Sequence, residues 1–204
     1  MKEIILIGAG GHAISCIDVI EESKKFKISG IVDNDKSILD CLGYPVIGRD
    51  KDLKTLREKY EFAFIAIGQI KSPKSRIDLF NRLKKFNYKL PTVISPRAHV
   101  SNLSIIGEGT IIMHDAIVNA NASVGFNCII NNKALIEHDA KIANNCHIST
   151  GAIINGSSVI NDNCFIGSGS VIREEIEIGC NCVISASSFV RKNINPNSVI
   201  KNDE

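Results

Sequence analysis

The stretch VGFNCIINNKALIEHDAKIANNCHISTGAII, residues 124–154, repeats one pattern every six residues. An Ile or Val stands at every sixth position from Val100 to Val190, sixteen times in all, and a small residue stands two positions earlier except at Ile176. A strict period of six is typical of a hexapeptide β-solenoid, in which each repeat is one short strand and one turn. Three repeats close one coil of a triangular prism, so residues eighteen apart are expected to stack.

The residue types at the turns support this interpretation. Residues i and i+2 of a strand share a face, so both the Ile or Val and the small residue are expected to point into the prism. Stacked coils then bury a continuous apolar core. Residues that tolerate a positive φ recur at the corners: Gly109, Asp115, Asn121, Asn127, Asp139, Asn145, Gly151, Asn163, Gly169 and Asn181.

The first 91 residues have a different pattern, in which buried strands alternate with helices. Strands are expected at residues 2–7, 27–32, 44–47 and 62–67, and helices from residue 11 to about 25, at 50–59 and at 73–86. This alternation predicts a small, Rossmann-like parallel sheet. We therefore expect an α/β domain over residues 1–91 and a β-solenoid domain over residues 92–204.

The turn after the first strand reads Gly8-Ala9-Gly10-Gly11-His12-Ala13, with Asp33 twenty positions further on. This arrangement places a phosphate at a helix N-terminus and a ribose hydroxyl near a carboxylate. The ligand should lie beyond the strand C-termini, at Gly10, Gly11, His12, Asp33 and Gly68. A domain this short suits a mononucleotide or a nucleotide-sugar better than NAD. A structural turn without a ligand and an oxidoreductase are the alternatives.

Composition excludes several classes of protein. The net charge is +2, with 17 Lys and Arg against 12 Asp and Glu in residues 1–91, an excess too small to indicate nucleic-acid binding. No signal peptide or membrane-spanning run is apparent, so a cytoplasmic protein without a membrane partner is expected.

The cysteines are expected to be structural. Four of the seven lie eighteen apart in the small-residue register, at positions 128, 146, 164 and 182, and should stack as buried apolar side chains. Cys16 falls in an expected helix and Cys41 in an expected loop. No C-x-x-C pair is present, and no metal site is expected.

The histidines of the solenoid are the candidates for chemistry. His138 lies between Glu137 and Asp139, and a carboxylate partner is what a general base needs to fix its tautomer. Gly156 lies one coil above, where a glycine leaves its N–H accessible as an oxyanion donor. His147 should face outward, half a coil away, so it can meet His138 only between neighbouring prisms. An exposed surface histidine is the alternative for His138.

The chain resembles bacterial sugar acyltransferases that join a nucleotide-sugar-binding α/β domain to a left-handed hexapeptide β-helix. These include UDP-amino-sugar N-acetyltransferases of the bacillosamine type, perosamine N-acetyltransferases and sialic acid O-acetyltransferases. Four segments carry the resemblance: Ile7-Gly8-Ala9-Gly10-Gly11-His12, Phe64-Ile65-Ala66-Ile67-Gly68, Ile136-Glu137-His138-Asp139 and His147-Ile148-Ser149-Thr150-Gly151-Ala152.

The resemblance implies a homotrimer that uses acetyl-CoA, with active sites between adjacent β-helices. It implies that His138 is the general base, that Asp139 orients it, and that His147 and the Gly156 amide hold the thioester carbonyl. The remaining implied contacts are Ser168 and Ala186 with the coenzyme, and Gly10, Gly11, His12, Asp33 and Asn34 with the nucleotide.

One segment departs from the family pattern. Relatives commonly continue an Asn-x-Ser-Val segment with a Gly-x-Pro-Ala-Lys loop, whereas this sequence continues from Val199 with Ile-Lys-Asn-Asp-Glu. That coenzyme-covering loop is therefore not expected.

The predicted reaction is direct N-acetylation of a nucleotide-linked 4-amino-4,6-dideoxy sugar for surface glycan synthesis. Sialic acid O-acetylation is the alternative, with Lys71, Lys74 or Arg76 as the cation for the substrate carboxylate, although the same cations suit a pyrophosphate. His99 and His114 are interpreted as surface or interface residues. A trimeric scaffold without catalysis is the alternative from a different class.

Overall fold

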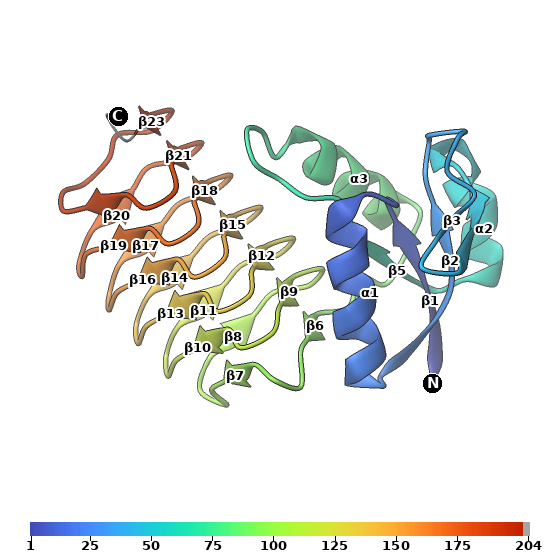
Figure 1. Ribbon diagram of the computed structural model, residues 1–204, viewed down its shortest axis with the longest axis horizontal. Helices are drawn as coiled ribbons and strands as arrows, with labels where there is room; N and C mark the ends of the chain where they lie inside the picture. Colours follow the sequence, from blue (N-terminus) through green and yellow to red (C-terminus); the bar gives the residue numbers. More distant parts are fainter. Residues whose placement is uncertain (202–204) are drawn as a thin grey trace.

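Residues 1–201 are described by a computed structural model, which contains an α/β part followed by a β-helix (Figure 1). The α/β part holds one five-stranded sheet in the order β3-β4-β2-β1-β5, parallel except between β3 and β4. Its strands are β1 (Lys2–Ile7), β2 (Phe26–Val32), β3 (Asp40–Cys41), β4 (Tyr44–Gly48) and β5 (Phe62–Ile65). Its helices are α1 (Gly11–Ser23), the 3₁₀ turn η1 (Asp50–Asp52), α2 (Leu53–Lys59) and α3 (Lys74–Lys85).

The predicted elements of the α/β part are present, with differences at their ends. The expected helix over 50–59 divides into η1 and α2. The strand predicted over residues 62–67 ends at Ile65, because the carbonyls of Ile65 and Ile67 accept hydrogen bonds from the Arg76 side chain. The prediction that Cys41 lies in a loop was wrong, since Cys41 pairs with Tyr44 in an antiparallel hairpin.

The β-helix has three faces of stacked two-residue strands. The first face contains β6 (Val93–Ile94), β9 (Ile111–Ile112), β12 (Ile129–Ile130), β15 (His147–Ile148), β18 (Phe165–Ile166), β21 (Val183–Ile184) and β23 (Val199–Ile200). The second contains β7 (His99–Val100), β10 (Ile117–Val118), β13 (Leu135–Ile136), β16 (Ile153–Ile154), β19 (Val171–Ile172) and β22 (Phe189–Val190). The third contains β8 (Ile105–Ile106), β11 (Ser123–Val124), β14 (Lys141–Ile142), β17 (Val159–Ile160) and β20 (Glu177–Ile178).

The register of the coils confirms the predicted period. Val118 pairs with Ile136, and Ile136 pairs with Ile154, eighteen residues apart at each step. These inward side chains are fully buried, as the rule of alternation along a strand requires. The last coil is shorter, because Val183 pairs with Val199 after sixteen residues.

The corners and the cysteine column also follow the prediction. All ten corner residues expected to adopt a positive φ do so. Cys128, Cys146, Cys164 and Cys182 are buried free thiols stacked one coil apart, so their role in the described chain is packing. No cluster of three or more metal-ligating side chains occurs within residues 1–201.

Five corner asparagines form a hydrogen-bonded ladder along the edge between the third and first faces. Four of the five side-chain amides donate to the side-chain oxygen one coil further on, over 2.9 to 3.3 Å. The members are Asn127, Asn145, Asn163, Asn181 and Asn197. All amides point the same way along the ladder, so the side-chain oxygen of Asn127, the first member, has no asparagine before it to donate to it. Arg76 donates a hydrogen bond to this oxygen instead.

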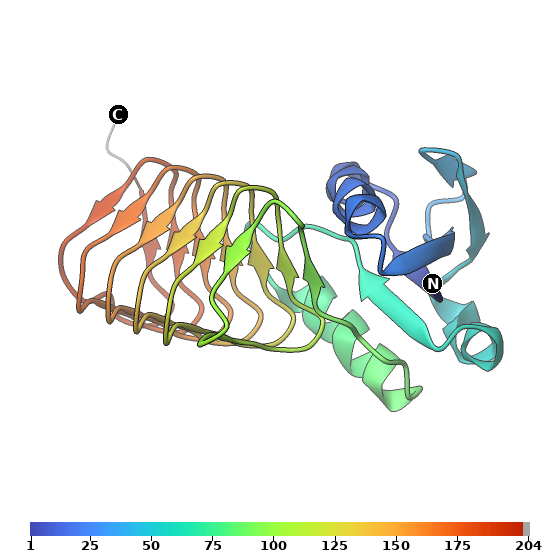
Figure 2. The ribbon, with the colours of Figure 1, turned by 90° about the horizontal axis from the view of Figure 1, so that it is seen from below.

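The α/β part packs on the first face of the β-helix, from β6 to β15 (Figures 1 and 2). Ile17 and Ile20 of α1 share a buried cluster with Ile111 and Ile129 of the β-helix. On the other side of the sheet, Phe80 of α3 stacks on Phe126 with ring centroids 4.9 Å apart. Both helices therefore contribute apolar contacts to the junction. None of the helices within residues 1–201 has the length and apolar character needed to cross a bilayer.

Candidate active site

The His138 imidazole is paired with the carboxylate of the next residue. His138 follows β13 at the corner between the second and third faces, and its Nδ1 lies 2.8 Å from Asp139 Oδ2. The other oxygen of Asp139 accepts a hydrogen bond from Asn121, and Glu137 is occupied by the side chain of Asn119. Of the two carboxylates considered from the sequence, Asp139 is therefore the partner.

This pairing sets the protonation of both groups. The hydrogen bond to Asp139 raises the pKa of His138, and the same bond lowers the pKa of Asp139. Because a carboxylate can only accept, Nδ1 of His138 carries the proton and Nε2 is left as the basic nitrogen. The ring is exposed to solvent, with 64% of the side chain accessible, so Nε2 can reach a substrate.

Gly156 lies one coil above His138, where any larger residue would displace the imidazole from its position. A Cβ on Gly156 would lie 2.8 Å from Cε1 and 2.9 Å from Nε2 of the imidazole. The N–H of Gly156 has no hydrogen-bond partner among residues 1–201. A free amide beside a basic nitrogen is the arrangement that general-base acyl transfer requires.

These residues line a surface cavity of about 470 Å³. Its walls are rich in carboxylates and contain no basic side chain other than His138. The lining residues are Glu137, His138, Asn155, Gly156, Ser157, Glu174 and Glu175.

His147 lies on the first face and is not near this cavity. It points away from the prism axis, as predicted, but it is only 6% exposed because the loop after β5 covers it. Its Nδ1 lies 2.5 Å from the carbonyl oxygen of Gln69, its Nε2 lies 3.1 Å from Asn131 Nδ2, and its ring packs edge-on against Phe165. Burial lowers the pKa of His147 to about 4, so the ring is neutral.

The predicted coenzyme contacts lie near the same edge of the prism. The Ser168 hydroxyl is 2.9 Å from the hydroxyl of Ser149, which is one coil above Asn131. Ala186 is one coil above Ser168, and both residues are exposed. Within one chain, His138 therefore lies apart from His147, Ser168 and Ala186. The spacing of half a coil between His138 and His147 predicts this separation. The end of the segment that departs from the family pattern, residues 202–204, lies outside the described residues.

The predicted nucleotide contacts fall into two groups, of which the first surrounds His12. A Cβ on Gly10 or Gly11 would meet no atom within 4 Å, so backbone at the start of α1 is open to a ligand. Burial of the ring, together with a smaller effect of the nearby cation Arg76, lowers the pKa of His12 to about 3. Gly68 lies against His12, since a Cβ at 68 would be 3.6 Å from the His12 Cβ.

The second group surrounds Asp33 at the C-terminal ends of β1, β2 and β5. A cavity of about 330 Å³ opens there, lined in part by Asp33, Asn34 and Gly8. Asp33 Oδ2 accepts the N–H of Ala9 over 2.7 Å, so the acidic residue holds the glycine-rich turn as well as facing the cavity. Asn34 Oδ1 accepts the N–H of Asp50.

Arg76 does not reach a substrate site. Its side chain is 1% exposed and donates to the carbonyls of Ile65 and Ile67 and to both oxygens of Asn127. The expectation that Arg76 pairs with a substrate carboxylate or pyrophosphate was wrong, because docking of α3 on the β-helix buries it. Lys71 and Lys74 are exposed.

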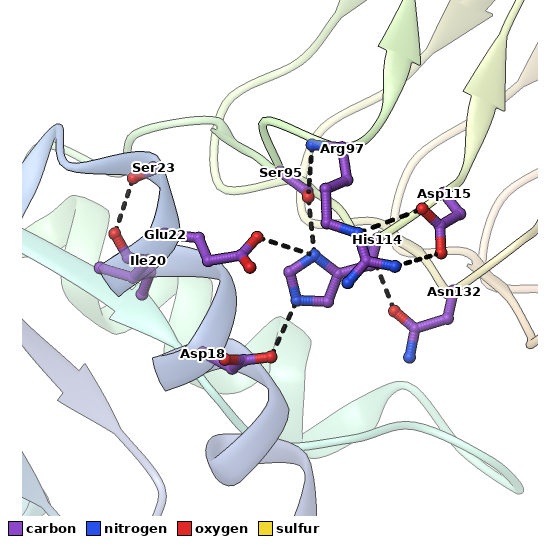
Figure 3. Close-up of polar contacts among 9 residues, drawn as sticks. All are labelled: Asp18, Ile20, Glu22, Ser23, Ser95, Arg97, His114, Asp115 and Asn132. Atoms are coloured by element: carbon purple, nitrogen blue, oxygen red, sulfur yellow. Dashed lines mark hydrogen bonds and ion pairs between the residues drawn. The ribbon is translucent and has the colours of Figure 1, made fainter.

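His114 is an interface residue, as predicted (Figure 3). Its Nε2 lies 3.0 Å from Asp18 and its Nδ1 lies 3.5 Å from Glu22, both on α1. The Ser95 hydroxyl lies 2.7 Å from the same Nδ1. His114 therefore links the lowest coils of the β-helix to the α/β part. His99 is exposed.

Sequence reasoning missed the residues that join the two parts at His147, above all Gln69 and Asn131. Neither belongs to a motif, and their partners are 78 and 16 residues away in the chain. The one available signal was the position of Gln69 directly after Gly68, at the C-terminal end of a sheet strand, where ligand contacts gather.

Known families and structures agree with this architecture. Residues 3–83 match the PglD N-terminal domain, and residues 157–192 match the bacterial transferase hexapeptide, six repeats. A comparison with curated protein sequences gave no match. A histidine-to-asparagine variant of perosamine N-acetyltransferase from Caulobacter crescentus, solved with CoA and GDP-perosamine, is 27% identical with a TM-score of 0.92, covering 100% of this chain and 98% of that chain.

Two further structures extend the comparison. The acetyltransferase domain of PglB from Neisseria gonorrhoeae, in complex with acetyl coenzyme A, is 26% identical with a TM-score of 0.91, covering 97% of this chain and 95% of that chain. WeeI from Acinetobacter baumannii, at 22% identity and a TM-score of 0.86 over 99% and 98% of the two chains, supports the fold alone. The chain therefore belongs to the hexapeptide-repeat family of bacterial sugar acyltransferases whose N-terminal domain is of the PglD type.

Proposed function

We propose that this chain transfers the acetyl group of acetyl-CoA to the amino group of a nucleotide-linked 4-amino-4,6-dideoxy sugar, for surface glycan synthesis. The observation that carries the proposal is the triad of His138, Asp139 and Gly156, in which a basic nitrogen lies beside a free backbone N–H. The relatives solved with CoA and GDP-perosamine, or with acetyl coenzyme A, support the donor and the class of acceptor.

In this reaction His138 Nε2 accepts a proton from the acceptor nitrogen as that nitrogen attacks the thioester carbonyl. The C–N bond forms, and the N–H of Gly156 stabilises the negative charge on the former carbonyl oxygen. The carbonyl then re-forms as the C–S bond breaks, and the proton on His138 passes to the sulfur, so that coenzyme A leaves as the thiol and His138 is neutral again. Asp139 holds the imidazole and stabilises its cationic form. No covalent enzyme intermediate is needed, because both substrates are held together.

The charge of the cavity supports N-acetylation over sialic acid O-acetylation. Glu137, Glu174 and Glu175 line the cavity next to His138, and a carboxylate-bearing acceptor would be repelled by them. An amino sugar, which is cationic until it loses a proton, would be attracted. Arg173, which precedes Glu174 in the sequence, is already bound to Glu174 over 2.9 Å. These charges favour the amine.

The acceptor nucleotide is proposed to bind to residues 1–91. Acetyl-CoA, the acyl donor, is proposed to bind to residues 92–204. Open backbone at Gly10 and Gly11 suits a phosphate at the start of α1, and the cavity beside Asp33 and Asn34 suits the nucleoside. Gly68 lies against His12, and the His12 ring is near enough to Arg76 and to His147 of the β-helix to interact with them electrostatically. The reaction is placed in the cytoplasm, where seven free cysteines stay reduced.

A homotrimer is proposed because one chain does not complete the site. His138 and the His147 edge lie on different corners, and a neighbouring β-helix would bring them together. The second face offers the contact surface, since its outward positions form an apolar stripe along five coils. These positions are Ile117, Leu135, Ile153, Val171 and Phe189, of which Phe189 is 61% exposed. Sedimentation should give three times the chain mass of 22.2 kDa.

The test is release of free thiol from acetyl-CoA with a panel of UDP- and GDP-linked 4-amino-4,6-dideoxy sugars and sialic acids. Turnover on an amino sugar is expected, with a loss of roughly 10²- to 10⁴-fold in His138→Ala. Turnover on sialic acids alone would move the assignment to O-acetylation. A folded trimer that releases no thiol with any acceptor would favour a scaffold.

A further inference from the structure

The buried contacts of His147 determine which of its two nitrogens carries the proton. Gln69 O is a carbonyl oxygen and can only accept, so Nδ1, 2.5 Å away, must donate to it. On the other side of the ring, Nε2 lies 3.1 Å from Asn131.

The orientation of the Asn131 amide is fixed independently. Its Oδ1 accepts the backbone N–H of Asn132 over 2.8 Å, so Nδ2 is the atom that faces His147. An amide nitrogen can only donate, and Nε2 must therefore accept. Both constraints select the same neutral tautomer, with the proton on Nδ1, and burial of the ring keeps it neutral.

The carbonyl of Gln69 is itself held in place from the β-helix. The Gln69 side chain is 3% exposed, and its Nε2 donates to the backbone carbonyl of Asn145 over 2.8 Å. Asn145 belongs to the corner ladder, whose lower end binds Arg76 of α3. The loop after β5 is thus attached to the β-helix at Asn145 as well as at His147.

We propose that Gln69 and Asn131 are positioning residues that fix His147 as the Nδ1–H tautomer, so that His147 has no N–H left for the substrate. The second hydrogen of Asn131 Nδ2 is then the hydrogen-bond donor that His147 and Asn131 together can offer to the coenzyme or acceptor. This inference rests on the proposed function for its catalytic meaning, whereas the tautomer itself can be measured without any substrate.

The first experiment is ¹⁵N NMR of the full chain labelled at histidine, at pH 7. The His147 signals, assigned from a His147→Asn variant, should show a protonated Nδ1 and an unprotonated Nε2. A protonated Nε2, or an imidazolium, would overturn the proposal whether or not the protein acetylates an amino sugar.

Two variants test the positioning residues. Asn131→Asp replaces the donor by a carboxylate, which should draw a proton onto Nε2 and raise the pH at which His147 titrates; Arg76 and His12 are the charged or titratable groups nearby. Gln69→Met keeps the side-chain volume but removes the donor to Asn145, and the tautomer should become mixed while kcat/KM falls about tenfold.

The matched control is Tyr88→Phe, which also removes one buried hydrogen bond to a backbone carbonyl, here that of Leu53. It should lower the Tm but leave the His147 signals and kcat/KM unchanged. Wild-type His147 signals in Asn131→Asp, or an unchanged kcat/KM in a folded Gln69→Met, would overturn the proposal. If Gln69→Met does not fold, the other two measurements still decide it.

Discussion

Gly156 leaves the space that the His138 imidazole occupies, because a Cβ at position 156 would lie 2.8 Å from Cε1 of that ring. The two residues are eighteen apart and lie on successive coils at one corner. The general base and the oxyanion donor are therefore adjacent for a geometric reason, since one coil of the β-helix separates them.

We predict that Gly156→Ala folds normally but is a poor catalyst. The φ of Gly156 is not in the left-handed region, and the clash is with an exposed side chain that can move away. Displacement of the imidazole by about 1 Å should lower kcat roughly 10²-fold. The check is kcat together with Tm, and the control is Ser123→Ala, at an outward strand position of β11 that does not line the cavity. An unchanged kcat would show that His138 does not act from this position.

Asp139→Asn is predicted to change the pH profile. Asp139 raises the pKa of His138, and catalysis needs the neutral imidazole, so the acidic limb of kcat/KM lies at a higher pH in the wild type. Removing the charge should move that limb to lower pH and reduce the plateau, because the imidazolium that forms during the reaction is no longer stabilised. A profile that keeps its acidic limb in place would assign the limb to another group.

Substitutions of two glycines in the first turn should separate an effect on folding from an effect on nucleotide binding. Gly8 has φ +108°, and a Cβ there would lie 2.3 Å from Cγ2 of Ile67, so Gly8→Ala should lower the free energy of unfolding by about 2–4 kcal/mol. Gly10→Ala meets no neighbour and should change stability by less than about 0.5 kcal/mol. It should instead weaken nucleotide binding about tenfold, measured by calorimetry. Unaltered nucleotide affinity in Gly10→Ala would place the phosphates elsewhere.

Arg76→Met should destabilise the chain by about 2–4 kcal/mol, because three buried backbone carbonyls and the Asn127 side chain lose their donor. The matched control is Arg97→Met. Arg97 is half exposed and pairs with Asp115, so its loss should cost no more than about 1 kcal/mol. Urea unfolding of both variants measures the difference. Equal losses in the free energy of unfolding would mean that the buried Arg76 network stabilises the chain no more than a surface ion pair does.

The fold should lose stability in mild acid. Burial lowers the pKa of His12 to about 3 and that of His147 to about 4, whereas both titrate near 6.5 when unfolded. Between these values the unfolded chain binds more protons, so the free energy of unfolding falls as pH drops from about 6.5 to 4, by up to ~1.4 kcal/mol per pH unit for each group. His147→Gln should flatten this dependence in urea unfolding at pH 7 and pH 5. A variant as acid-sensitive as the wild type would exclude His147 as a cause.

The sequence was sufficient for the β-helix and for the His138 site. Each coil uses the same inward Ile or Val and the same small residue, so the period of six determines register, core and corner conformation together. The spacing of eighteen also predicts that Gly156 lies beside His138. These relationships need only the regular step between successive coils.

The surroundings of His147, Gln69 and Arg76 were decided by the tertiary structure. Strand alternation correctly pointed His147 outward, but an outward side chain is exposed only if nothing packs on it. The contact of His147 with Gln69 joins residues 78 apart, and that of Arg76 with Asn127 joins residues 51 apart. Both depend on how the α/β part docks on the β-helix, and no repeat or local motif encodes that docking. The protonation of His147 follows from it, because burial and two fixed hydrogen-bond partners set its charge and its tautomer.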